Sequence, residues 1–159
     1  MSAREGGFSL IELLVVIAVI LILVAIAVPS YIRARISANE AAAVSSLRAI
    51  TTAEVVYSTT YGIGYSDALA KLGPDPAGGP PSANFAGLVD ELIAGGNKSG
   101  YNFIYNADPP VAGYTVSYKL RGDPAIPGRS GIRYFYVEED GRIHFKPGAP
   151  AGPGDPVLD

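Results

Sequence analysis

The chain has 159 residues, enough for one domain and a long helix, and its 19 glycines and 13 prolines predict a loop-rich globular part. It has no cysteine and one histidine, which excludes disulfides and a zinc site built from His and Cys ligands. The formal net charge of −3 includes no basic excess that would indicate nucleic-acid binding.

Residues 1–7 form a short polar leader, and a long apolar run follows it. From Phe8 to Val28 the run is 21 residues, close to the ~20 that cross a bilayer as a helix. Its one ionisable side chain is Glu12, where a carboxylate in lipid costs about 2.5–3.5 kcal/mol. A charge in this place suggests a function, and we expect the carboxylate to have a partner of opposite charge.

A cut between Gly7 and Phe8 would supply that partner. Phe8 would then carry a free, positively charged α-amine, and Glu12 lies four residues along, on the same helix face. Glu12 can pair with its own amine or with the amine of a neighbouring helix. The second pairing would set the register between helices, which is the better-attested use of a buried ion pair.

The string Gly6-Gly7-Phe8-Ser9-Leu10-Ile11-Glu12, with the apolar run behind it, resembles the cleavage and methylation segment of type IV prepilins and type II secretion pseudopilins. In that family a prepilin peptidase cuts after the glycine and methylates the new N-terminal residue. The resemblance implies that Gly6, Gly7 and Phe8 form the processing site, that Phe8 is N-methylated and that Glu12 is the docking carboxylate for assembly.

The same resemblance implies where the protein acts and with what. The subunit would wait among the lipids of the bacterial inner membrane as a single-pass protein, with its C-terminal part outside the cytoplasm. An assembly platform would then add it to a homopolymer, either a surface pilus or a periplasmic pseudopilus. We therefore expect a structural protein and no enzyme, and the sequence leaves pilus and pseudopilus open.

An ordinary secretory signal peptide is the alternative interpretation of this segment. Ala25-Ile26-Ala27 has the A-x-A form of a signal-peptidase site, which would release a soluble binding module or enzyme starting at Val28. Glu12 argues against it, because a cleaved signal has no use for a charge there.

Residues 8–29 and 30–60 are expected to form the membrane half and the amphipathic half of one long helix. Pro29 removes the hydrogen bond to the carbonyl of Ala25, which predicts a kink; many family members carry a proline near this place. In the second half, apolar residues recur at helical spacing and predict the face that packs on the domain: Ile36, Ala43, Leu47, Ile50, Ala53 and Tyr57.

Residues 61–100 are expected to be a connecting region. Gly62-Ile63-Gly64 is a lone GxG, which we interpret as loop. Two short helices are predicted, over Tyr65–Leu72 and Gly87–Ala94, each followed by a glycine stop.

Residues 101–146 are expected to form an antiparallel sheet of about four strands, and 147–159 an irregular Pro/Gly-rich tail. Alternation and turn signals predict the strands, with Asp140-Gly141 as a hairpin turn: Tyr101–Asn106, Tyr114–Leu120, Arg133–Glu138 and Arg142–Lys146. The fold class is therefore α+β and pilin-like, one long N-terminal helix packed on this sheet.

Candidate chemistry in the globular part is sparse. His144 is expected to be a plain strand residue, and Asn97-Lys98-Ser99 is a glycosylation tripeptide of a kind that is frequent by chance. The acidic group Glu138, Glu139 and Asp140 could bind calcium, as C-terminal loops of major pseudopilins do, but a solvated hairpin turn is the favoured interpretation. We expect no cofactor and no catalytic residue.

Overall fold

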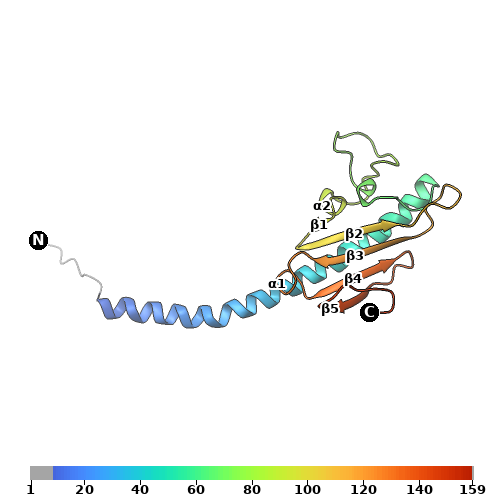
Figure 1. Ribbon diagram of the computed structural model, residues 1–159. Coiled ribbons are helices and arrows are strands. Elements are labelled where there is room, and N and C mark those ends of the chain that lie inside the picture. Colours follow the sequence, from blue (N-terminus) through green and yellow to red (C-terminus); the bar gives the residue numbers. More distant parts are fainter. Residues whose placement is uncertain (1–8, 159) are drawn as a thin grey trace, which may run out of the picture. The chain divides into compact units, whose positions relative to one another are not determined.

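The computed structural model describes residues 9–158, and the chain divides into two units with the boundary between Arg35 and Ile36. The helix α1 (Leu10–Tyr61) belongs to both units. Its first part, residues 10–35, belongs to the first unit, and its second part, residues 36–61, is the long helix of the globular unit (Figure 1).

The second part of α1 buries one face against the sheet. The six apolar positions of the predicted stripe are all buried, with exposed fractions of 9% or less. This burial confirms the helical period, since those residues share one side of the helix only at about 3.6 residues per turn.

The sheet is antiparallel with strands in sequential order, β1 to β5. Figure 1 shows the sheet packed along the C-terminal part of α1. Side chains from β2, β3 and β4 meet the helix and form one core with it: Tyr101, Phe103, Leu120, Phe135 and Val137. The strand bounds are β1 (Asn97–Lys98), β2 (Tyr101–Ala107), β3 (Tyr118–Pro124), β4 (Arg133–Glu138) and β5 (His144–Pro147).

The strand predicted over Tyr114–Leu120 is misplaced, because β3 begins at Tyr118 and continues to Pro124. Backbone groups before Tyr118 bond elsewhere: Tyr114 pairs with Val111, and the Thr115 carbonyl accepts the N–H of Tyr65 at 2.9 Å. The side chains of residues 114–117 do alternate in type, but these residues form a loop whose backbone groups have other hydrogen-bond partners.

The two short helices are also shorter than predicted. In place of Tyr65–Leu72 there is a 3-10 turn, η1 (Leu69–Leu72), because the backbone N–H of Tyr65 bonds to Thr115 and that of Ser66 bonds to a side chain of α1. In place of Gly87–Ala94 there is α2 (Glu91–Ala94), which starts after Asp90 because that carboxylate caps it through the N–H of Ile93.

The C-terminal hairpin and tail differ in detail from the prediction. The last strand starts at His144, because the Arg142 N–H bonds to the side chain of Asp140 inside the turn. The tail has no regular element over residues 148–158, yet it runs along β5: Phe145 N–H donates to Pro156, and Leu158 N–H donates to Ile143. The tail thus covers an edge that would otherwise offer free backbone groups.

Candidate functional site

The first part of α1 presents its apolar side chains to the outside. From Leu10 to Val28 the large apolar residues are 47–80% exposed. By length and composition, α1 is the one helix in the described part of the chain that could cross a membrane. An apolar surface of this extent is far larger than the patches that soluble monomers expose, so it requires lipid or other protein around it.

Glu12 lies in the first turn of this helix. The helix start is closed by the carbonyl of Ser9, which accepts the N–H of Glu12 at 3.0 Å and that of Leu13 at 3.2 Å. An acidic side chain in the first turn is favoured by the positive end of the helix dipole. Gly6, Gly7 and Phe8, which the sequence predicts as the processing site, lie outside the described residues.

Pro29 lies inside α1, which is helical on both of its sides. The side chain of Arg33 donates from Nε to the carbonyl of Pro29, at 3.4 Å. The kink at Pro29 stays a prediction.

Two buried carboxylates on α1 were not predicted. The first, Glu40, accepts the backbone N–H groups of Ile132 (2.8 Å) and Arg133 (3.1 Å), and it pairs with Arg133 Nε at 2.7 Å. Burial opposes its charge, but these bonds and the guanidinium prevail and lower the pKa of Glu40. Glu40 thus ties the helix to the start of β4.

The second, Glu54, is fully buried and takes part in none of the ion pairs among the described residues. It accepts the N–H of Ser66 at 2.8 Å, and its other oxygen lies 2.5 Å from the Ser66 hydroxyl. The Tyr105 hydroxyl completes the cluster by donating to the Ser66 carbonyl at 2.8 Å. Burial raises the pKa of Glu54, although the bonds from Ser66 and Tyr105 oppose the rise.

The sequence does hold a signal for both carboxylates. Glu40 and Glu54 fall at steps of three and four between apolar members of the buried stripe. A charged residue at a core position of a helix is a candidate for a paired or protonated group.

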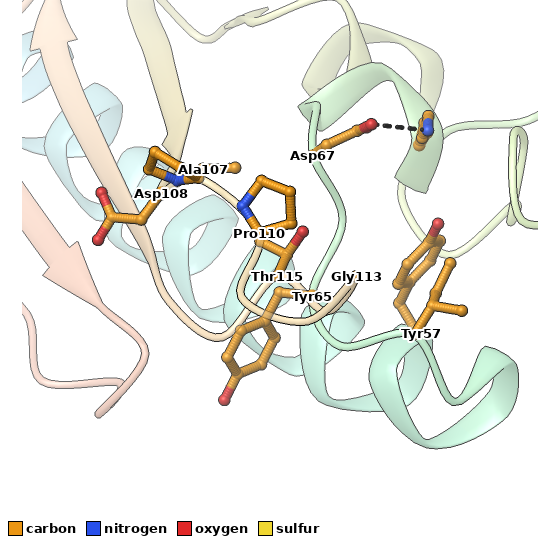
Figure 2. A pocket seen from close by; sticks show the side chains of 11 residues that line it. Tyr57, Tyr65, Asp67, Ala107, Asp108, Pro110, Gly113 and Thr115 are labelled. Atoms are coloured by element: carbon orange, nitrogen blue, oxygen red, sulfur yellow. Dashed lines mark hydrogen bonds and ion pairs between the residues drawn. The ribbon is translucent and has the colours of Figure 1, made fainter.

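A pocket of about 460 Å³ lies between the segment after α1 and the β2–β3 loop, with Tyr57, Tyr65, Pro110 and Thr115 among its lining residues (Figure 2). Its carboxylates are already paired: Asp67 with Lys71 at 2.9 Å, and Asp108 with Lys119 at 3.0 Å. These lining residues do not form a nucleophile and base set, and we assign no chemistry to the pocket.

The remaining candidates make local bonds. His144 lies in β5, and its Nδ1 is 2.7 Å from the carbonyl of Asp155, which ties the tail to the strand. At the end of β4, Glu138 accepts the Tyr136 hydroxyl at 2.5 Å, and in the β4–β5 turn Asp140 accepts the N–H of Arg142. Among residues 9–158 no three acidic or histidine side chains converge as metal ligands would.

Comparison with known proteins points to the N-terminal segment. Residues 2–28 match the family model of the prokaryotic N-terminal methylation motif. The type IV major pilin protein PilA of Myxococcus xanthus (strain DK1622) is 42% identical over 53 residues. The N-terminal segment therefore carries the prokaryotic N-terminal methylation motif, and part of the chain is similar to a type IV major pilin.

The likeness to pilins is confined to part of the chain. The match to PilA covers 33% of this chain and 24% of the pilin, so it spans about a quarter of that relative's length. No solved structure matches the chain significantly. The prepilin-type segment includes Glu12 and the exposed apolar run, whereas the sheet, the pocket and both buried carboxylates lie outside the family model.

Proposed function

We propose that the protein is a structural subunit of a type IV pilus-like filament, made as a prepilin and polymerised through its apolar N-terminal helix. One observation carries the proposal above all: residues 10–28 form a helix whose large apolar side chains are exposed. A membrane can cover this surface before assembly, and the helices of other subunits can cover it afterwards.

Processing precedes assembly in this scheme. A prepilin peptidase cuts between Gly7 and Phe8 and methylates Phe8, which removes the polar leader and leaves a charged amine at the helix start. The family match over residues 2–28 supports this step. The globular unit then lies outside the cytoplasm, and an assembly platform in the inner membrane draws the subunit into the polymer.

In this scheme, the carboxylate of Glu12 pairs with the N-terminal amine of a neighbouring subunit. A lone carboxylate within the apolar boundary is costly, and pairing with a cationic amine of a neighbouring helix offsets that cost. We therefore predict that Glu12→Gln, which keeps the shape and removes the charge, abolishes incorporation into filaments while membrane insertion is retained. The measurement is the amount of protein in sheared surface material and in the carbonate-washed membrane fraction.

A matched control separates docking from net charge. Glu91→Gln removes one negative charge from an exposed position of the globular unit, and it should assemble as the wild type does. Normal assembly of Glu12→Gln would show that the carboxylate has no docking role.

A type II secretion pseudopilin is the second candidate, because the methylation motif over residues 2–28 does not distinguish it from a pilus subunit. The two candidates differ in where the polymer accumulates. A pilus subunit is recovered from the cell surface by shearing, whereas a pseudopilin stays with the cell envelope.

A further inference from the structure

Just past the apolar run, α1 carries one exposed tyrosine and two exposed arginines. Tyr31 is 66% exposed, and Arg33 and Arg35 are exposed as well. Tyrosine and arginine are the residues that settle at the boundary between hydrocarbon and water, where an apolar body and a polar head are both satisfied. We call these three residues the collar.

The arginines have no acidic partner near them on the helix. Within the described residues up to Arg35, the one acid is Glu12, at the other end of the apolar run. The next acid along α1, Glu40, is buried and paired with Arg133. The contact that Arg33 makes through its side chain nitrogen is with its own helix, at the carbonyl of Pro29.

The position of these charges opposes the usual bias of membrane proteins. If the globular unit lies outside the cytoplasm, two arginines sit at the translocated end of the span, whereas arginine and lysine are normally enriched on the cytoplasmic side. Moving positive charges outward across an energised membrane, against a potential that is negative inside, costs free energy. A favourable interaction at the outer face would offset this cost.

We propose that the collar binds anionic phospholipid headgroups of the outer leaflet and thereby fixes the depth of the unassembled subunit. The inference rests on the proposed function. At 1.5 Å per residue, Arg33 lies about 32 Å along the helix from Glu12, and the hydrocarbon core is about 30 Å thick. A collar held at the outer phosphates keeps Glu12 at the inner boundary, within reach of water and of a neighbour's amine.

The test measures lipid selectivity around the full, leader-processed chain in vesicles. Traces of spin-labelled phosphatidylglycerol or phosphatidylcholine give the relative association of each lipid with the protein. We expect the wild type to prefer phosphatidylglycerol, by up to about fivefold for each arginine at the phosphates, with a smaller preference in high salt.

A double variant and a matched control locate the effect. The double variant Arg33→Gln with Arg35→Gln should bring the ratio of phosphatidylglycerol association to phosphatidylcholine association close to one. Arg48→Gln should leave it unchanged, since Arg48 is also exposed but belongs to the globular unit and not to the membrane-spanning part of the helix. A double variant that keeps the wild-type preference would overturn the collar, and so would a wild type with no preference.

Two further outcomes are informative. A double variant that keeps the lipid preference but fails to assemble would assign the arginines to contacts with neighbouring subunits and contradict the proposal. Loss of the chain from vesicles in alkaline carbonate would overturn the proposed membrane step, and the collar with it. If the chain stays in the vesicles but shows no preference for phosphatidylglycerol, only the collar proposal is overturned.

Discussion

Glu40 and Glu54 share the buried face of α1, yet their surroundings drive their pKa values in opposite directions. Glu40 has two backbone N–H donors and the guanidinium of Arg133, so its charged form is favoured. Glu54 is buried without a cation, and this burial outweighs the N–H and hydroxyl bonds from Ser66, so its neutral form is favoured.

This contrast predicts a pH dependence of stability for Glu54. A raised pKa in the folded state means that the folded chain holds a proton that the unfolded chain releases, so stability falls as pH rises from the unfolded pKa of about 4.3 to the folded value. Glu54→Gln mimics the protonated group and should remove this fall. The measurement is the free energy of unfolding of the full chain in detergent across pH 4–8.

Glu40→Gln serves as the opposite control. Because the pKa of Glu40 is lowered, its contribution is present above the unfolded pKa and is lost as pH falls through the folded value. The variant should therefore cost about 1–3 kcal/mol at neutral pH and less in acid. If Glu54→Gln were destabilised at neutral pH in the same way, Glu54 would be an ionised residue in the fold.

At the scale of elements, the segment after α1 makes a close contact with the β2–β3 loop, in addition to the bonds of Ser66 with Glu54 and Tyr105. Gly64 pairs with Thr115 in an isolated bridge, and Tyr65 donates to the Thr115 carbonyl. A Cβ on Gly64, at φ +80°, would lie 2.2 Å from that carbonyl oxygen, whereas a Cβ on Gly62, at φ +65°, would meet nothing within 4 Å. The two glycines of the GxG string therefore have different reasons to be glycine.

The pair makes a matched prediction. Gly62→Ala should cost about 1–2 kcal/mol, the price of a left-handed residue with a side chain. Gly64→Ala should cost about 1–3 kcal/mol more, because the bridge to Thr115 must open as well. Thermal unfolding of both variants gives the comparison, and equal losses would show that the bridge does not hold the segment.

The elements that were predicted well are those with many mutually consistent signals. The buried stripe of α1 repeats over six positions, and the β4–β5 hairpin is marked by Asp140-Gly141. The strand before β4 was misplaced because residues 114–117 alternate as a strand does, while Tyr114 closes a local turn with Val111 and Thr115 accepts the N–H of the distant Tyr65. Glu40 and Glu54 were missed for a related reason, since a carboxylate's burial depends on donors distant in sequence.

At the scale of the whole molecule, the two units have different requirements. Residues 36–158 form a buried core of their own. The large apolar side chains of residues 10–28 are exposed, and a membrane or a polymer must cover them. The candidate site could be proposed from the sequence because its residues lie in one short contiguous string, which the model of the N-terminal methylation motif matches. What surrounds that string in an assembly depends on other chains.

The mass of the N-terminal peptide tests the central claim most directly, taken separately from sheared surface material and from membranes. We expect a peptide that starts at N-methylated Phe8, and a bulky substitution such as Gly7→Trp should leave the leader attached. Methylated Phe8 in the sheared fraction identifies a pilus subunit, and its confinement to membranes indicates a pseudopilin or a minor subunit. A chain that starts at Val28 would contradict the filament function and indicate an ordinary secreted protein.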